Sequence, residues 1–390
     1  MKSILFISHD ASRTGAPIIF LNFLKWFKAN SDIPFQILLK NGGDLESEFA
    51  KLAPVSVFNP GYVKKNILLR ILNRLGFDFS RNSHLKKLRK KLLRANIGLI
   101  YSNTVTNGEV IEFLSMLQCP VISHVHELEW IVRYYAGLDN FQKVKKHTQE
   151  YIAVSEIVKH NLVENHQVLE DKIHTIYGFI PQKVESERQY WQTRASICQE
   201  LDIPQNAKII CASGTTGWRK GTDLFVQLAD AVTRKYADHP VYFLWIGGEN
   251  EGGSFGEFWH DVQNLNLDQQ VKFLGIKSNP LDYFNACDVF AMPSREDPFP
   301  LVCLEAASMG KPIVCFDKAG GIKEFVEDDC GFVVPYLDID GMADKIVHLL
   351  HFPELCERLG KQARQKVKAR HDIEATAPKI LRVIENSLAS

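Results

Sequence analysis

The sequence has no excess of charge of either sign and no long uncharged apolar run. Its 46 Lys and Arg residues balance 46 Asp and Glu residues, so nucleic acid is not expected as its main partner. No uncharged apolar stretch approaches the roughly 20 residues that a membrane span requires. The amino-terminal apolar run at Ile4–Ile7 is too short for a signal peptide. We therefore expect a cytoplasmic protein, attached at most to the inner face of the cytoplasmic membrane.

Several common motifs are also missing. The eight cysteines lie far apart, without a Cys-x-x-Cys pair or a neighbouring His tract, which excludes the usual zinc sites and disulfide frameworks. We expect them to be small core residues in a reducing compartment. No G-x-G-x-x-G fingerprint follows a predicted strand, which disfavours an NAD-linked oxidoreductase.

The pattern that is present is an alternation of short aliphatic runs with helical segments, which is typical of βαβ units and a buried parallel sheet. The first series of predicted strands is Ile4–Ile7, Ile37–Leu39, Val55–Phe58, Leu99–Tyr101, Val121–Ser123, Ile152–Val154 and Ile173–Tyr177. The second is Ile209–Cys211, Tyr242–Ile246, Val271–Leu274, Val289–Met292, Ile313–Phe316 and Phe332–Val334. At 390 residues, this predicts two doubly wound α/β domains, residues 1–180 and 181–372, and a last helix at 373–390.

An acidic loop follows the predicted strand Val289–Met292. In open parallel sheets, ligands bind beyond the carboxyl ends of the strands, so loops at that edge are the best site candidates. Here Asp297 lies in the loop and Glu305 lies in the apolar helix that follows, whose start offers unpaired N–H groups to a phosphate or a sugar hydroxyl. The alternative for Glu305 is a structural partner for a buried polar group, because an unpaired buried carboxylate is costly.

A glycine-rich basic loop, Ser213–Gly221, follows the predicted strand Ile209–Cys211. Its glycines allow close backbone approach to phosphate oxygens, and Arg219 and Lys220 add positive charge. It is not a Walker loop, because Gly221 rather than Ser or Thr follows Lys220. A solvated turn with a basic helix start is the alternative interpretation.

The predicted first domain carries two further candidates at strand ends. His124 and His126 point to the same side of the strand Val121–Ser123 by alternation; a sugar or phosphate contact and a hydrogen-bonded structural role both remain open. Gly15 precedes a helix and is either a phosphate contact or a simple loop glycine. No third ligand accompanies the histidines, and the Asp338-x-Asp340 pair precedes a helix as a cap would. We therefore assign no metal.

The segment Lys64–Arg94 holds eleven Lys or Arg residues and one acid, Asp78. Its leucines fall on helical stripes, at 68, 71, 72 and 75 and again at 85, 88, 92 and 93. Such a helix either lies on anionic lipid or covers the first sheet with its charges solvated.

The second-domain residues resemble the signature of the retaining glycosyltransferases of family four, the group 1 glycosyltransferases, which have the GT-B fold. That signature is an acid, an apolar helix start, a Glu eight residues after the acid, Gly-x-Pro and a later Gly-Gly…Glu. It matches Asp297-Pro298-Phe299-Pro300-Leu301-Val302, Glu305-Ala306-Ala307, Gly310-Lys311-Pro312 and Gly320-Gly321…Glu324. The resemblance implies two Rossmann-like domains with an interdomain cleft, the last helix crossing back onto the first domain.

By this resemblance the second domain holds a nucleotide sugar and the first the acceptor. Glu305 would bind the ribose hydroxyls, and Asp297 or the adjacent Glu296 would contact the transferred sugar. The other implied donor contacts are Arg219 and Lys220, the amides of Phe299, Leu301 and Val302, the base pocket at Gly275, Ile276 and Lys277, and Gly15 and His126 of the first domain. The expected catalytic residues are His126, Lys220 and Asp297.

The expected activity is metal-independent transfer of a hexose from a nucleoside diphosphate sugar, most simply a UDP-sugar, to an acceptor hydroxyl with retention. Polysaccharide, lipopolysaccharide or glycolipid synthesis is the expected setting, with a sugar or lipid-linked sugar as acceptor. The sequence departs from the family pattern at Pro300, which lacks an N–H and replaces a common Gly. Alternatives are an epimerase or a phosphorylase on the same fold, or a non-catalytic nucleotide-sugar- or lipid-binding assembly protein.

Overall fold

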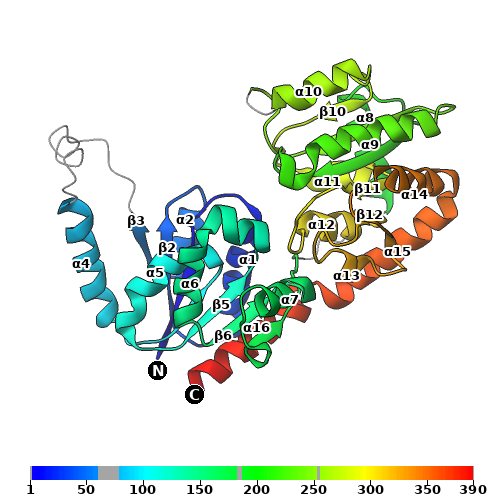
Figure 1. Cartoon of the computed structure of the whole chain (residues 1–390). Coiled ribbons are helices and arrows are strands. Elements are labelled where there is room, and N and C mark those ends of the chain that lie inside the picture. Colours follow the sequence, from blue (N-terminus) through cyan, green and yellow to red (C-terminus); the bar gives the residue numbers. More distant parts are fainter. Residues whose placement is uncertain (1, 60–78, 182–186, 253–254, 390) are drawn as a thin grey trace. The chain divides into compact units, whose positions relative to one another are not determined.

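The chain divides into two compact units, shown in Figure 1. The computed structural model describes residues 2–59, 79–181, 187–252 and 255–389. The first unit comprises Met1–Val154, Val158–Ile176 and Thr376–Ser390, and the second comprises Ser155–Ile157 and Tyr177–Ala375. The predicted boundary near residue 180 lies just beyond Ile176, and most of the last helix is grouped with the first unit.

The first unit is built on a parallel sheet of seven strands in the order β3-β2-β1-β4-β5-β6-β7. Its strands are β1 Ser3–Ser8, β2 Phe35–Asn41, β3 Val55–Asn59, β4 Ile97–Ser102, β5 Val121–Val125, β6 Glu150–Ala153 and β7 Ile173–Thr175. The central strands are buried on both faces, as their continuous aliphatic runs predicted. The order reverses between β1 and β4, so the loops after these two strands lie side by side at the carboxyl edge.

Helices flank this sheet. They are α1 Gly15–Asn30, α2 Glu46–Ala50, α4 Phe79–Leu93, α5 Gly108–Leu114, α6 Leu138–His147, α7 Glu156–Glu164 and α16 Ile373–Ala389. Short 3₁₀ turns lie at Val105–Asn107, Ser115–Leu117 and Glu170–Lys172, and a π-helix lies at Ile131–Gly137. On α1, Phe20, Phe23 and Phe27 pack against Phe6 of β1 with edge-to-face ring contacts, which fixes the start of α1 beside the end of β1.

The second unit has a parallel sheet of six strands in the order β10-β9-β8-β11-β12-β13. Its strands are β8 Lys208–Ser213, β9 Val241–Ile246, β10 Val271–Phe273, β11 Val289–Met292, β12 Ile313–Phe316 and β13 Gly331–Val334. Its helices are α8 Glu187–Glu200, α9 Thr222–Lys235, α10 Phe255–Asn264, α11 Pro280–Ala286, α12 Leu301–Ser308, α13 Lys323–Val326, α14 Ile339–His351 and α15 Pro353–Arg370, with a 3₁₀ turn at Trp218–Lys220. Here the order reverses between β8 and β11. The two units confirm the predicted pair of doubly wound α/β domains.

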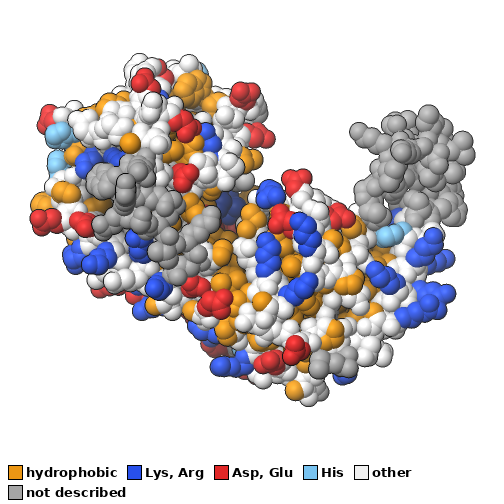
Figure 2. All heavy atoms as spheres, turned by 180° about the vertical axis from the view of Figure 1, so that it is seen from behind, with side chains coloured by type: hydrophobic (Ala, Val, Ile, Leu, Met, Phe, Trp, Pro, Cys, Tyr) orange, Lys and Arg blue, Asp and Glu red, His pale blue; other side chains and the backbone are white. Residues whose placement is uncertain are grey.

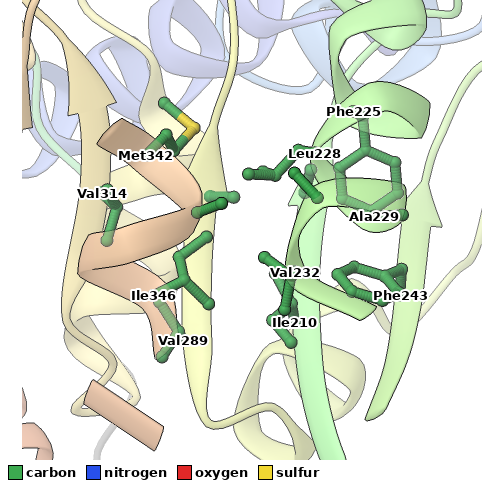
Figure 3. Close-up of a cluster of buried hydrophobic side chains, with 14 of the residues drawn as sticks. Ile210, Phe225, Leu228, Ala229, Val232, Phe243, Val289, Val314, Met342 and Ile346 are labelled. Carbon is green, nitrogen blue, oxygen red and sulfur yellow. The ribbon is translucent and has the colours of Figure 1, made fainter. Parts of the chain in front are cut away.

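One large apolar cluster supports the second sheet. Figure 3 shows side chains of α9, among them Phe225 and Leu228, facing Met342 and Ile346 of α14 above the strands. All of these side chains are buried. This packing anchors α9, and with it the basic loop that immediately precedes it.

The described half of the basic segment is α4. Leu88 and Leu92 are buried, and the Lys91 ammonium and the His84 ring bond to Ser56 and Val57 of β3. The apolar stripe of α4 therefore packs on the protein, and Leu93, which is 53% exposed, is turned away from it. The first predicted stripe, residues 68–75, lies outside the described residues. Among those described, no helix combines the length and apolar character needed to cross a membrane.

Candidate functional site

The strand order of the second unit brings the two predicted site loops together. The basic loop follows β8, the acidic loop follows β11, and these two strands are paired neighbours. The amides of Arg295 and Glu296 donate to the carbonyl of Arg219 at 2.9 and 3.4 Å, and the Arg219 guanidinium donates to the Glu296 carbonyl at 2.8 Å. The loops thus hold each other at the point where a doubly wound sheet binds its ligand.

A glycine is required where these loops meet. Gly221 has a φ of +71°, and a Cβ there would lie 2.0 Å from the carbonyl oxygen of Pro293. Only glycine allows both this backbone conformation and this approach. The short turn ending in Lys220 is therefore pressed against the start of the acidic loop.

The side chains of Lys220 and Asp297 form an ion pair across the two loops. They are 15% and 10% exposed, respectively, so the pair is largely shielded from water. The backbone of Asp297 is also fixed, because its amide donates to the carbonyl of Ala319 at 2.7 Å. Gly320 packs closely against it, since a Cβ on Gly320 would lie 1.6 Å from the carbonyl oxygen of Asp297. The structure thus joins two predicted site residues that are 77 positions apart.

The neighbouring Arg295 has a structural partner. Arg295 makes a bidentate salt bridge with Asp223 of α9 at 2.7 and 2.6 Å and lies over the Trp218 ring at 5.1 Å. The carboxylate also raises the pKa of Arg295. Sequence reasoning missed this pair, which ties the acidic loop to the first turn of α9. Glu296 is half-buried, and its carbonyl is bound by Arg219.

The start of α12 borders the same loops. The amides of Leu301 and Val302 are the first of the helix and have no acceptor within it, so they are available to an anion. Glu305 is half-buried one turn further on, on the same helix face as Leu301. The side chain of Phe299 has a packing role. Its ring is buried between the rings of Tyr177 and His371, with centroid distances of 5.4 and 5.3 Å.

The predicted base-pocket loop lies two strands away, after β10. Gly275 accepts a backbone bond from Gly247 of the loop after β9 at 2.8 Å, which places the two loops together. Ile276 is 86% exposed. Lys277 instead points to protein partners, bonding Glu200 at 3.1 Å and lying over the Tyr283 ring at 5.1 Å.

In the first unit, His126 lies at the carboxyl end of β5 beside the end of β4. Its Nε2 lies 3.0 Å from Oδ1 of Asn103, a buried residue directly after β4. The ring of His124 lies 4.1 Å away, centroid to centroid, and its Nδ1 bonds the Tyr101 hydroxyl at 2.7 Å. Both histidines thus face the same side, as the strand alternation indicated.

Glu127, which sequence reasoning did not single out, is buried beside His126. One of its carboxylate oxygens, Oε2, accepts the amides of His126 and Val105 at 2.9 and 3.3 Å. Burial raises the pKa of Glu127 to about 7, although hydrogen bonds from Thr104 and these amides oppose the rise. Burial lowers the pKa of His126 to about 3, with a smaller contribution from His9. The imidazole of His126 is therefore neutral near neutral pH.

Gly15 is the first residue of α1. A Cβ built there meets nothing within 4 Å, so neither packing nor backbone strain requires a glycine. The next residue, Ala16, accepts a hydrogen bond from Asn103 Nδ2 at 3.0 Å. Asn103 therefore connects His126 to Ala16, the residue that follows Gly15 at the start of α1.

The remaining motifs have structural roles. Asp338 caps α14 by accepting the amide of Gly341 at 2.9 Å, which confirms the predicted cap. Glu324 of the Gly-Gly…Glu motif accepts the first amides of α7, from Glu156 and Ile157, at 2.8 and 3.0 Å. Within the described ranges, no group of three or more His, Cys, Asp or Glu side chains is arranged to hold a metal ion.

Comparisons with known proteins cover both sequence and structure. Residues 193–366 match the family "Glycosyl transferases group 1". Over 215 residues the chain is 29% identical to an N-acetyl-alpha-D-glucosaminyl L-malate synthase of Bacillus anthracis, covering 54% of this chain and 53% of the relative. It is 31% identical over 188 residues to a D-inositol 3-phosphate glycosyltransferase of Corynebacterium urealyticum, covering 46% and 43%. The chain thus spans about half the length of the curated relatives it matches.

The solved structures match over the whole chain. The Anabaena protein HepE in complex with UDP and glucose has a TM-score of 0.79 at 19% identity, covering 99% of this chain and 100% of that one. A sucrose-phosphate synthase of Thermosynechococcus elongatus has a TM-score of 0.75 at 18% identity, covering 100% of both chains. These matches confirm the GT-B fold.

Proposed function

We propose that the chain, whose residues 193–366 match the glycosyl transferases of group 1, transfers a hexose from a nucleoside diphosphate sugar to an acceptor hydroxyl. We take the donor to be a UDP-sugar, and the product to be a polysaccharide, lipopolysaccharide or glycolipid. HepE, the Anabaena structural neighbour, was solved with UDP and glucose, which supports this choice.

The observation that carries the proposal is the Lys220–Asp297 pair at the edge between β8 and β11. A lysine, a carboxylate and the first amides of α12 converge there, which is the chemistry that a sugar diphosphate requires. When the donor binds, its diphosphate replaces Asp297 as the partner of the Lys220 ammonium. The released carboxylate then accepts a hydrogen bond from a hydroxyl of the hexose.

The protein stabilises the negative charge that develops on the leaving diphosphate. As the bond from the anomeric carbon to the diphosphate oxygen breaks, its electron pair moves to the diphosphate, which Lys220, Arg219 and the amides of Leu301 and Val302 stabilise. The acceptor oxygen bonds the anomeric carbon on the face that the diphosphate leaves, and its proton passes to a diphosphate oxygen. Retention and independence from metal are part of the proposal and rest on the family resemblance.

The other site residues keep the roles that the resemblance implies. Glu305 binds the ribose hydroxyls, and Gly275 and Ile276 border the base, with Lys277 holding that loop through Glu200. Gly15 allows a phosphate to approach the start of α1, because no non-neighbouring atom of the described residues lies within 4 Å of a Cβ built there. His126, being neutral, contacts a sugar hydroxyl rather than a phosphate.

The test is transfer from radiolabelled UDP-glucose, and from a panel of other UDP-, GDP- and ADP-sugars, to oligosaccharide and lipid-linked acceptors. We expect nucleotide release that depends on the acceptor, and a loss of roughly 10²- to 10³-fold in Lys220→Ala. Lys235→Ala is the matched control, since Lys235 is at the far end of α9 and pairs with Asp344 at 2.6 Å. Binding of the nucleotide sugar without turnover would instead support an assembly protein. Conversion of the free nucleotide sugar to its epimer, without transfer, would support an epimerase.

We further propose that α4 binds an anionic membrane surface. Figure 2 shows Lys and Arg side chains gathered over this helix. The exposed ones are Lys86, Lys87, Arg89, Lys90 and Lys91. Each contributes about 1 kcal/mol near an anionic bilayer. Replacing Lys86 and Lys90 by Gln should weaken binding to vesicles containing phosphatidylserine, whereas Gln at Lys361 and Lys368 on α15 should not; equal effects would refute a role for α4.

A further inference from the structure

The side-chain amide of Asn103 is held in one orientation. Asn103 is 1% exposed, and its own backbone amide donates to Ile7 of β1 at 2.9 Å. Its Nδ2 lies 3.0 Å from the carbonyl oxygen of Ala16. A carbonyl can only accept, so the NH₂ end of the amide must face Ala16 and the Oδ1 end must face the other way.

This orientation determines which nitrogen of His126 carries the proton. The Oδ1 atom of Asn103 can only accept, and it lies 3.0 Å from Nε2 of His126. The hydrogen therefore resides on Nε2, and in the neutral imidazole Nδ1 carries the lone pair. The tautomer follows from the carbonyl of Ala16 through two consecutive hydrogen bonds.

We propose that Asn103 is a positioning residue that holds His126 as the Nε2–H tautomer, so that Nδ1 accepts a hydrogen bond from a hydroxyl of the sugar substrate. This inference rests on the proposed function for its substrate. In this arrangement His126 accepts a hydrogen bond from the sugar and does not donate a proton to the phosphate. It also gives Asn103 a role that links the start of α1 to the reacting sugar.

The surrounding charged and titratable groups are consistent with a neutral His126. They are His124 on β5, His9 and Asp10 after β1, Lys40 on β2, Tyr101 on β4 and Glu127 after β5. Asp10 pairs with His9 at 3.5 Å, and Glu127 accepts backbone amides, so neither carboxylate is bonded to the His126 ring.

The direct test is the ¹⁵N NMR spectrum of the histidine side chains in the full chain. We expect His126 to show a protonated Nε2 and an unprotonated Nδ1, and His126→Gln identifies its signals. In Asn103→Leu, which keeps the size but has no acceptor, this preference should weaken. A protonated Nδ1 in the wild type, or an unchanged spectrum in Asn103→Leu, overturns the proposal.

The pH dependence of activity provides a second test. A purely structural role of Asn103 would not change it. Asn103→Asp keeps an acceptor at Nε2 but stabilises the imidazolium, so the pKa of His126 should rise. Because the wild-type pKa is about 3 and a neighbouring carboxylate raises it by roughly 1 to 3 units, the kcat/KM of this variant should approach that of the wild type at about pH 8 and fall as the pH drops from about 6 toward about 4, as Nδ1 becomes protonated. Asn103→Leu should lose roughly tenfold at every pH.

Asn107 supplies the matched control. It is equally buried in the same segment, and its side-chain amide donates to the Ser102 hydroxyl at 3.1 Å, whereas Asn103 accepts from His126. Asn107→Asp should leave the His126 signals and the shape of the pH profile unchanged; the same acid limb in Asn107→Asp would contradict the proposal. If no nucleotide sugar is turned over, the proposed function fails, while the NMR spectrum still decides the tautomer.

Discussion

Replacing Glu127 by Gln should change the pH dependence of the stability of the first unit. Burial raises the pKa of this carboxyl from 4.5 to about 7. The folded state therefore favours the protonated form, and the stability that this provides is complete below about pH 4.5 and is lost as the pH rises through about 7. At 1.36 kcal/mol per pKa unit, the loss between about pH 5 and pH 8 is on the order of 2 kcal/mol.

Gln keeps the oxygen that accepts the amides of His126 and Val105 but cannot ionise. We therefore compare the unfolding free energy of Glu127→Gln with that of the wild type at each pH. The variant should gain roughly 2 kcal/mol over the wild type between pH 5 and pH 8. The three histidines of the cluster, His9, His124 and His126, are present in both proteins, and burial lowers the pKa of each, so the pH dependence that they contribute is common to both.

Hydrogen exchange of the β4 and β5 amides measures this difference, because a chain of two units does not unfold in one step. Glu164→Gln is the control, since Glu164 is exposed. The difference in opening free energy between this variant and the wild type should not depend on pH. An equal change in opening free energy at both pH values would refute a buried carboxyl with a raised pKa.

Three further outcomes follow from the site. Glu305→Ala should raise the KM for the donor by roughly 5- to 100-fold, the effect of 1–3 kcal/mol of lost hydrogen bonding; an unchanged KM would remove Glu305 from the donor site. Gly15→Ala should leave thermal stability unchanged, since its Cβ meets nothing within 4 Å, yet weaken donor binding; equal affinity would make Gly15 a simple loop glycine. Gly320→Ala should lower the melting temperature and the activity together, because its Cβ would lie 1.6 Å from the Asp297 carbonyl oxygen; a stable, active variant would refute that constraint.

Much of the fold could be predicted because buried parallel strands are continuous apolar runs. All of the predicted strands are present. The π-helix at Ile131–Gly137 was not predicted, since its sequence carries the same periodicity as an ordinary helix.

The candidate site could be predicted only in part. The carboxyl-edge rule selected Lys220 and Asp297 as candidates, but their ion pair depends on β8 and β11 being neighbours, which the sequence does not specify. Asn103 and Glu127 were missed because each has hydrogen-bond partners on loops that are distant in the sequence. Glu324 was part of the motif, but its contact with Glu156, 168 positions away, has no local signal.

The most direct test of the account is stabilisation of the wild-type chain and of Lys220→Ala by UDP-sugars. At a concentration about 100 times its dissociation constant, a bound donor should add about 2.7 kcal/mol to the unfolding free energy of the wild type. The same concentration should add little to Lys220→Ala and the full amount to Lys235→Ala. Equal stabilisation of Lys220→Ala, or no stabilisation of the wild type by any nucleotide sugar, would contradict the proposed donor site.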